Sequence, residues 1–345
     1  MSPGSIKRHP MVASVAQRWR QLTHHRTGAL PRTLIACSGG ADSSALAIAM
    51  AVIAGDAAPK ILALAHIRHD MRPDSEVEAD ANAVGALSQS FGLPVMHADA
   101  LAADAPRTEA TYRKLRYAAL AQLARAHGYA FVATAHHADD QLESLLLALT
   151  RGAGPAGLRG IAPRRLIDHA LPRIMLIRPM LGASHADAIQ LCRDANVDWS
   201  EDHTNVDVTR LRTALRLGPV AELLQLVPTA GARAAHTASL MRNVVRLLDS
   251  LADDAFQPPA GPWSRNNLRT LPRIVLSHGL RRALAHQSTR GHDRHTARAL
   301  APITRAIRSN AGETRTFNLA SDTVVTVTSD AVSISANPGH VATTG

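Results

Sequence analysis

The sequence predicts an α/β protein with a doubly wound, Rossmann-like parallel sheet, followed by a smaller, mainly helical domain that ends in a β-hairpin. Short apolar runs alternate with helix-length stretches as far as about residue 195, as expected of strands buried between two layers of helices. From residue 219 to about 309 the apolar periodicity is helical throughout. Residues 316–335 then alternate with a period of two, and Ser329-Asp330 stands where a hairpin would turn.

The predicted strands and helices alternate along the first part of the chain. An amphipathic helix over residues 8–30 carries Trp19 and Leu22 and comes first. The predicted strands are 33–37, 60–67, 93–97, 130–135 and 174–181, and the helices that follow them are 43–54, 75–91, 107–127, 139–149 and 184–195. Because crossovers between parallel strands are right-handed, this series predicts helices on both faces of the sheet.

A chain of 345 residues suits two domains. We predict a catalytic domain over 1–217, a linker near 205–218, a second domain over 219–337 and a tail over 338–345. No apolar run reaches the ~18 residues of a membrane span, and the first residues lack the pattern of a secretory signal. A cytoplasmic protein without a membrane partner is therefore expected; the sequence does not predict its oligomeric state.

Positive charge is concentrated toward the C-terminus. The net charge is +10, and residues 205–345 hold 17 Arg against 9 acidic residues. Because a guanidinium group can bind phosphate through two hydrogen bonds, such a segment suits a nucleic acid. With only three lysines in the chain, the surplus can also reflect a general preference for arginine.

The strongest local signal is Cys37-Ser38-Gly39-Gly40-Ala41-Asp42-Ser43-Ser44, between a predicted strand and a predicted helix. Two glycines allow the backbone to turn tightly, and the amides that follow point toward whatever lies over the helix N-terminus, which favours an anion. The Walker lysine is absent, so the loop suits a pyrophosphate held by amides and hydroxyls, with a metal ion neutralising charge. The simpler alternative is a serine-capped helix after a glycine turn.

Other polar groups lie where predicted strands end or helices begin. His136-His137-Ala138-Asp139-Asp140-Gln141-Leu142-Glu143 follows the fourth strand, and parallel sheets bind ligands at that edge. Helix capping explains one of these carboxylates, and the spacing is not that of a zinc site. Glu109, Arg113 and Arg116 can share one helix face, where an ordinary surface ladder is the alternative.

The eight-residue loop 37–44 resembles the PP-loop of ATP pyrophosphatases, which cleave ATP between the α and β phosphates. Further stretches resemble the tRNA(Ile)-lysidine synthases of that superfamily, in a short form. They are 66–72, 109–117, 133–144, 151–160, 178–179, 199–205 and 212–216. The chain departs from the family pattern at Arg68, Asp70 and Thr213.

The resemblance implies ligation of L-lysine to C2 of cytidine 34 in the CAU anticodon of tRNA(Ile), through an adenylated tRNA, with ATP and Mg²⁺. It implies catalytic roles for Asp140, Arg113 and Asp42, with Asp42 also a ligand of Mg²⁺. ATP would be bound by Ser38, Gly39, Gly40, Asp42, Ser43, Ser44, His66 and His136. The substrates would be bound by Arg72, Glu109, Arg116, His137, Asp139, Gln141, Glu143, Arg151, Arg212 and Arg216.

Two other functions remain open on the sequence. A PP-loop tRNA thiolase uses a persulfide cysteine or an iron–sulfur cluster, but Cys37 and Cys192 are the only cysteines and neither belongs to a CxxC. We expect both to be small core residues. A non-catalytic tRNA-binding protein is the third possibility, and the intact loop 37–44 argues against it.

Overall fold

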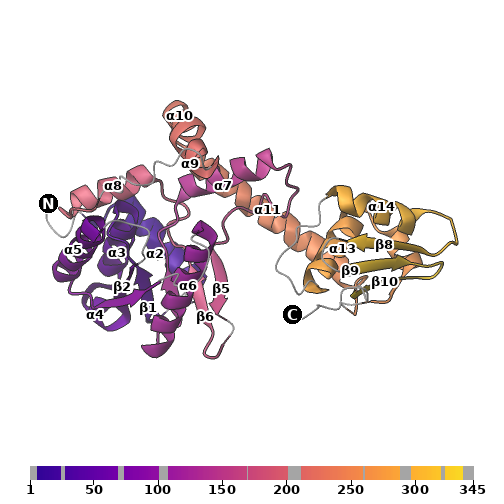
Figure 1. Cartoon of the computed structure of the whole chain (residues 1–345). Helices are drawn as coiled ribbons and strands as arrows, with labels where there is room; N and C mark the ends of the chain where they lie inside the picture. The colour runs from indigo at the N-terminus through magenta and orange to yellow at the C-terminus, as the bar shows by residue number, and fades with distance from the viewer. Residues whose placement is uncertain are drawn as a thin grey trace. The chain divides into compact units, whose positions relative to one another are not determined.

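The chain forms two compact units, residues 1–240 and 241–345 (Figure 1), each described by itself. The computed structural model describes residues 6–24, 28–68, 74–100, 108–168, 170–200, 211–258, 261–287, 297–319 and 323–336. The predicted tail over 338–345 lies outside these residues. The long helix α11 (Ala230–Asp253) runs from the first unit into the second.

The first unit contains the predicted doubly wound sheet, in the order β3-β2-β1-β4-β6-β5. Five of its strands are parallel: β1 (Thr33–Ala36), β2 (Leu62–Arg68), β3 (Val95–Asp99), β4 (Phe131–Ala133) and β6 (Ile174–Ile177). The sixth, β5 (Arg164–Asp168), is an antiparallel edge strand paired with β6. We did not predict β5, because its half-buried sequence Arg-Arg-Leu-Ile-Asp is not an apolar run.

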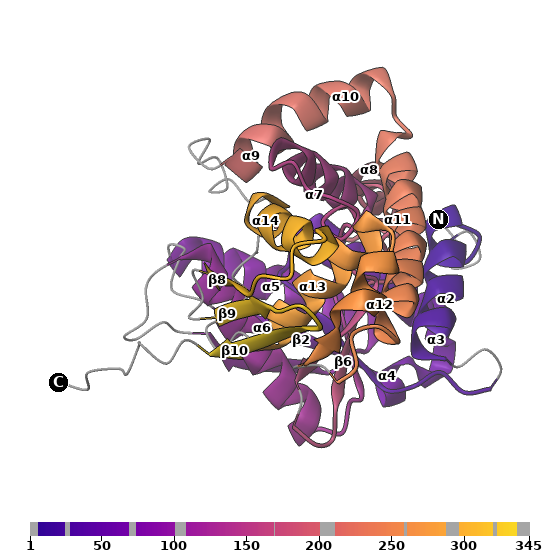
Figure 2. The ribbon, with the colours of Figure 1, turned by 90° about the vertical axis from the view of Figure 1, so that its right-hand side faces the viewer.

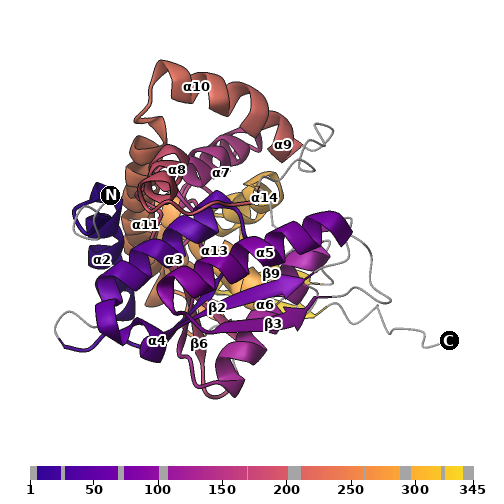
Figure 3. The same ribbon diagram turned by 90° about the vertical axis from the view of Figure 1, so that its left-hand side faces the viewer.

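Helices cover both faces of this sheet. On one face, α2 (Pro10–Thr23), α3 (Ala41–Ala54), α5 (Asp74–Phe91) and α8 (His185–Asp194) share a core with Ile35 of β1. Figure 3 shows α3 and α5 running beside β2 and β3. On the other face, α6 (Glu109–Ala126) packs on Leu34 of β1. Neighbouring side chains of one strand thus enter opposite cores, as the pleat of a strand requires.

A short helical segment connects α3 to β2. It consists of η1 (Gly55–Ala57) and α4 (Ala58–Ile61). Taken together, Ala41–Ile61 has the length and apolar composition of a membrane span, but nearly all of the first three turns of α3 is buried in the core of the first unit. The apolar composition therefore reflects burial between the sheet and its neighbouring helices.

The expected linker is replaced by helices where the structure describes it. Residues 201–210 lie outside the described part, and α9 (Leu211–Leu215), η2 (Arg216–Val220) and α10 (Ala221–Leu226) follow directly. Together with the start of α11 they pack on α7 (Ala138–Thr150) in an apolar cluster that includes Leu145, Val220 and Ala234. The expected boundary near 217–219 therefore falls inside the first unit, because this segment shares a core with α7.

The second unit combines helices with a four-stranded antiparallel sheet in the order β7-β10-β9-β8 (Figure 2). The strands are β7 (Trp263–Ser264), β8 (Arg315–Leu319), β9 (Thr323–Val327) and β10 (Ala331–Ala336). The helices are α12 (Arg265–Thr270), α13 (Arg273–Gln287) and α14 (Ala297–Arg308), which bury Leu276 and Ile303 against Val325. The predicted hairpin is β9–β10, and the sheet adds two strands to it.

Arg265 is a buried cation that stabilises the second unit without an acidic partner among the described residues. Its side chain is 3% exposed. It donates hydrogen bonds to the carbonyls of Ala306, Ile307 and Ser309 at the end of α14, and also to those of Ala311 and Thr328. The last carbonyls of a helix carry partial negative charge and lack helical partners, so one guanidinium satisfies the end of α14 and ties it to the hairpin.

We predict that Arg265→Met lowers the free energy of unfolding of the second unit, because the apolar side chain leaves several buried carbonyls without donors. The loss should be about 3 kcal/mol or more, measured by urea denaturation followed through tryptophan fluorescence. Arg269→Met is the matched control, since Arg269 is only half-buried and bonds to the side chain of Asn310. Equal stability of both variants would show that Arg265 has no such role.

Candidate active site

The candidate site lies at the carboxyl ends of β1 and β4, which are neighbours in the sheet. The chain leaves β1 for β2 on one side, whereas β4 and β6 lie on the other side, so the strand order reverses here. Loops on either side of such a reversal diverge and leave a crevice for a ligand. The loop 37–40 follows β1, and residues 134–137 follow β4.

The loop after β1 has the geometry of a phosphate cradle. Gly39 has φ +90°, and a Cβ there would lie 2.8 Å from the carbonyl oxygen of Asp80, so only glycine fits. The Ser43 hydroxyl lies inside the loop, where it donates to the Gly40 carbonyl (2.9 Å) and accepts from the Ser38 amide (3.2 Å). The loop is therefore preorganised before any ligand binds.

The other two serines of the loop differ in exposure, since Ser44 is buried and Ser38 is exposed. Ser44 is 1% exposed, and its amide bonds to the Gly40 carbonyl as the first turn of α3. The Ser38 hydroxyl lies 3.3 Å from that of Ser43, and the Gly39 carbonyl accepts from the amide of Ser200 (3.0 Å). Residues 199–200, which resemble a family motif, thus return to the phosphate loop.

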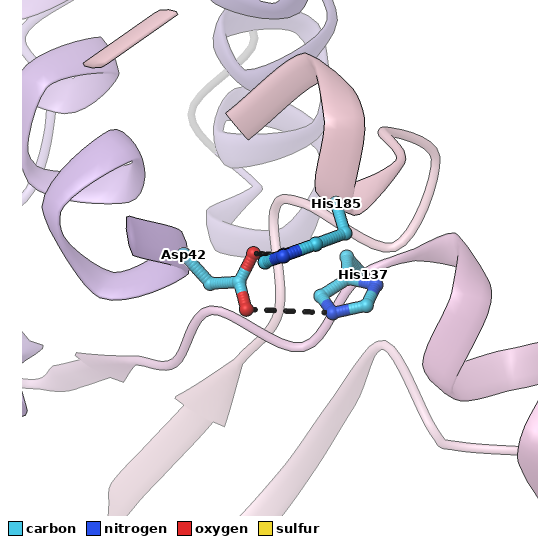
Figure 4. A group of neighbouring side chains, drawn as sticks. All are labelled: Asp42, His137 and His185. Atoms are coloured by element: carbon cyan, nitrogen blue, oxygen red, sulfur yellow. Dashed lines mark hydrogen bonds and ion pairs between the residues drawn. The ribbon is translucent and has the colours of Figure 1, made fainter. Parts of the chain in front are cut away.

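Asp42, at the start of α3, joins the loop to the starts of two other helices (Figure 4). One carboxylate oxygen lies 2.8 Å from Nδ1 of His185, the first residue of α8, and the other lies 3.5 Å from Nε2 of His137, the residue before α7. The two imidazoles lie beside each other, 5.7 Å between ring centres. One carboxylate therefore links the N-termini of three helices. His185 was missed, although it opens a helix at the same sheet edge.

Asp42 and the imidazoles of His137 and His185 shift one another's pKa toward the charged forms. Burial by itself raises the pKa of Asp42, but hydrogen bonds from His137 and His185 outweigh it and hold that pKa well below its usual value. Burial lowers the pKa of His137, but Asp42, Asp140 and Asp139 raise it to about 9. The hydrogen bond to Asp42 also raises the pKa of His185. At neutral pH the site therefore contains an imidazolium at His137.

Asp139 and Asp140 are held by backbone amides. Asp139 is buried; one of its oxygens accepts from the His185 amide (2.8 Å), and the other has no hydrogen-bond partner. Asp140 accepts from the His137 amide (3.0 Å) and lies 3.6 Å from the His137 ring nitrogen Nε2. Asp140 thus faces the imidazole that contacts Asp42, which places a second carboxylate beside the phosphate loop.

Gln141 and Glu143 connect α7 to neighbouring segments. Gln141 is fully buried and exchanges two hydrogen bonds with the backbone of Ile161, at 2.9 and 2.8 Å. These bonds hold the end of the glycine-rich stretch 151–160. Glu143, 2% exposed, forms ion pairs with Arg212 of α9 and Arg216 of η2. The side chains of both residues therefore have structural contacts, and their roles toward a substrate stay predictions.

Of the two predicted histidines of the nucleotide site, His66 is buried and His136 is half-buried. Nδ1 of His66 lies 3.1 Å from the Cys37 carbonyl, directly before the phosphate loop, and burial lowers the pKa of His66. Nδ1 of His136 lies 3.0 Å from the Thr134 hydroxyl. Burial lowers the pKa of His136 well below its usual value, and the charges of Arg178, Arg113 and Arg116 add to this. Both imidazoles are therefore neutral.

The remaining predicted residues lie elsewhere or outside the described part. Arg113 and Arg116, on α6, both lie over the ring of Tyr117, at 5.3 and 5.6 Å from its centre. Arg151 is exposed at the end of α7. Arg72 lies outside the described residues, and so does the side chain of Glu109.

Asp42, His137 and His185 offer three ligand atoms within 4.8 Å of one another. Mg²⁺ prefers oxygen ligands and usually takes one or two carboxylates together with phosphate oxygens and waters. The Asp42 carboxylate fits that requirement, whereas the two imidazoles are not typical Mg²⁺ ligands. The residues therefore fit a phosphate-bound Mg²⁺ held through Asp42.

Both cysteines are core residues, as predicted. Cys37 is 2% exposed and Cys192 is fully buried, and both lie in the core between the sheet and α3. Burial raises the pKa of both thiols, that of Cys192 to about 12. Neither therefore has the accessible, easily ionised thiol of a nucleophile.

Known proteins resemble this chain in sequence. Residues 11–223 match the family described as PP-loop domain. The tRNA(Ile)-lysidine synthase of Novosphingobium aromaticivorans is 33% identical over 257 residues, which cover 74% of this chain and 76% of that protein. The tRNA(Ile)-lysidine synthase of Salinispora tropica is 34% identical over 278 residues, which cover 77% and 79%.

Solved structures also resemble the fold. One of them is the U34-tRNA thiolase NcsA from Methanococcus maripaludis with its [4Fe-4S] cluster, with a TM-score of 0.53 and 12% identity. The likeness covers 67% of this chain and 79% of that one. Because only 12% of the residues are identical, this likeness supports the predicted fold alone.

We predict that Asp42→Asn lowers the pKa of His137 by roughly one unit or more, because the partner carboxylate is lost while burial remains. In the wild type the pKa of His137 is raised to about 9. The His137–Asp42 contact therefore stabilises the fold fully below about pH 6.5, and that contribution disappears as the pH rises through about 9. Histidine-selective NMR titration measures the shift, with Asp194→Asn on α8 as the control. A His137 titration that stays near pH 9 in Asp42→Asn would exclude this coupling.

Proposed function

The chain belongs to the tRNA(Ile)-lysidine synthase family of PP-loop enzymes, and from that membership we propose that it is a cytoplasmic ligase that joins L-lysine to tRNA(Ile) at the expense of ATP. The observation that carries the proposal is the contact of Asp42 with His137 and His185. It brings the phosphate loop and Asp140 into one site. The acceptor atom would be C2 of cytidine 34 in the CAU anticodon.

The first proposed step is adenylation of the tRNA. The PP-loop amides and the Ser38 hydroxyl bind the phosphates of ATP, and Mg²⁺ held through Asp42 neutralises their charge when bound. The C2 oxygen of the cytidine attacks the α-phosphate, and pyrophosphate leaves. The imidazolium of His137 and the guanidinium of Arg113 stabilise the negative charge that develops.

The second proposed step is attack by lysine. Its ε-amine forms a bond to C2, and AMP leaves. The ε-amine of lysine in water has a pKa of ~10.4 and is mostly protonated at neutral pH, so a base has to accept a proton from it. The Asp140 carboxylate is our candidate for that base, because it lies beside the His137 ring and part of its side chain is accessible to solvent.

The basic C-terminal unit is proposed to bind tRNA through phosphates, but part of its arginine surplus has internal partners. Arg265 is buried on helix carbonyls, and Arg282 forms ion pairs with Asp249 and Asp253. Arg298 and Arg305 lie exposed on the same face of α14. These two are better candidates for phosphate contacts than Arg282.

The test of the proposed function is incorporation of labelled lysine. Incubation of the protein with ATP, ¹⁴C-lysine and total tRNA should transfer label to tRNA, and Asp140→Asn should reduce the rate roughly 100-fold or more, as expected of a lost general base. Asp187→Asn, which alters only the cap of α8, should retain the activity. Wild-type protein that binds ATP and tRNA but transfers no label would contradict the proposal.

The thiolase alternative is tested by the cysteines. We predict that a Cys37→Ser, Cys192→Ala variant still joins lysine to tRNA, because the amine is itself the nucleophile and both thiols are buried. Any loss of activity should follow the loss of stability and recover at lower temperature. Sulfur transfer by the wild type, lost in a folded double variant, would support the thiolase instead.

A further inference from the structure

Four arginines gather around one buried tyrosine on the β6 side of the candidate site. The guanidinium carbon of Arg165 (β5) lies 4.6 Å from the ring centre of Tyr117, and those of Arg113 and Arg116 lie at 5.3 and 5.6 Å. Arg178, which follows β6, reaches the Tyr117 hydroxyl at 3.5 Å. Tyr117 itself is 7% exposed. One side chain therefore draws together cations from α6, β5 and the end of β6.

These cations have no acidic partner among the side chains that the structure describes. Other arginines of the same unit are paired: Arg125 with Asp168, and Arg212 and Arg216 with Glu143. Cations this close repel one another, so an anion that joins the cluster stabilises it. Burial raises the pKa of the Tyr117 phenol, but the charges of Arg113, Arg178 and Arg116 outweigh it and lower that pKa to about 8.

The hydrogen bonds of Arg178 give an independent indication of an anion site. It is 2% exposed, and its guanidinium bonds to the Ala162 carbonyl and the Tyr117 hydroxyl, while Nε has no hydrogen-bond partner. A buried charged group normally has its donors satisfied, because an unpaired one is costly. A buried donor without a partner, beside three further cations, indicates a site built for an anion.

We infer that Arg116, Arg165 and Arg178, arranged around Tyr117 beside Arg113, bind a phosphate group outside the PP-loop, namely a phosphodiester of the RNA next to the reacting nucleotide. Tyr117 is the positioning residue, because its ring and hydroxyl orient the guanidinium groups. The inference rests on the proposed function for the identity of the RNA.

The strand order favours the RNA over the phosphates of ATP. The PP-loop follows β1, whereas Arg178 follows β6 and Arg165 lies on β5, so β4 separates the two places. At roughly 4.8 Å between strands, β1 and β6 are about 10 Å apart. His136 stands between them, because it follows β4, the strand between β1 and β6. A nucleic acid that places its base near the PP-loop carries further phosphates that can reach such a flank.

The chemistry also favours phosphate over the carboxylate of lysine. Guanidinium groups bind phosphate oxygens with paired hydrogen bonds, and several of them exceed what one singly charged carboxylate can satisfy. The antiparallel strand β5 is needed to bring Arg165 to this place. The edge strand that the sequence did not predict therefore has a function in this proposal.

The test combines a protein variant with a neutral RNA linkage. An anticodon stem–loop RNA with one methylphosphonate, 5′ or 3′ of the cytidine, removes the charge of a single phosphate. We expect wild-type protein to bind one of these RNAs roughly tenfold more weakly than the unmodified RNA. Arg165→Ala should bind the unmodified RNA equally weakly and show no further loss with the methylphosphonate, because the two changes remove the same contact. Fluorescence anisotropy measures each affinity.

Control variants distinguish the loss of a phosphate contact from a general loss of RNA binding. A measurement with an ATP analogue distinguishes RNA from ATP as the source of the phosphate. Arg173→Ala, exposed at the turn end of the same hairpin, should bind RNA as the wild type does. Tyr117→Leu should weaken RNA binding as Arg165→Ala does, while Tyr117→Phe, which keeps the ring, should lose less. Loss of affinity for a non-hydrolysable ATP analogue, with RNA binding unchanged, would still support a phosphate site but assign the phosphate to the nucleotide.

Two results would overturn the inference. One is a folded Arg165→Ala protein with wild-type affinity for both the RNA and the ATP analogue. The other is a loss of affinity for lysine alone, which would assign the cluster to a carboxylate. Because these are binding measurements, they do not depend on turnover. A protein that binds RNA through this cluster but transfers no lysine would contradict the proposed function and leave the phosphate site standing.

Discussion

The arrangement of the site depends on one carboxylate that contacts two imidazoles. Asp42 stands in the first turn of α3, and its oxygens reach His185 at the start of α8 and His137 before α7. Each of these helices directs the positive end of its dipole toward the same place. The ion pairs keep His137 protonated and Asp42 ionised, so the phosphate loop, the acid-rich turn of α7 and the start of α8 are held as one unit.

Charge is distributed unevenly around this centre. Next to the phosphate loop three aspartates face two histidines, so carboxylates outnumber imidazoles there. Toward β6 and β5, arginines gather around Tyr117 without a described carboxylate. Glu143 marks a third region, where a buried carboxylate binds two arginines and attaches α9 and η2 to α7. A substrate that spans the site would therefore meet carboxylates paired with imidazoles in one region and a strongly positive region in the other.

Much of the fold was predictable because buried strands and their helices have distinct periods. The parallel strands, the phosphate loop and the final hairpin follow from apolar runs, glycines and alternation. Strand β5 could not be predicted in this way, because Arg164 and Arg165 give it the composition of a loop. It forms a strand because it pairs with β6 in the folded sheet. His185 was missed because one histidine in a helix start carries no local signal; only the strand order brings it to Asp42. The described part of the expected linker, residues 211–218, is helical, because α9 and η2 are short and gain their stability from packing on α7.

The central claim is that the Asp42 contact assembles a site that activates the tRNA before lysine enters. Exchange of labelled pyrophosphate into ATP, measured with tRNA present and lysine absent, tests this most directly. We expect exchange that requires tRNA, is lost in Asp42→Asn and persists in Asp194→Asn. Exchange at the wild-type rate in a folded Asp42→Asn protein, or exchange that does not need tRNA, would contradict the central claim.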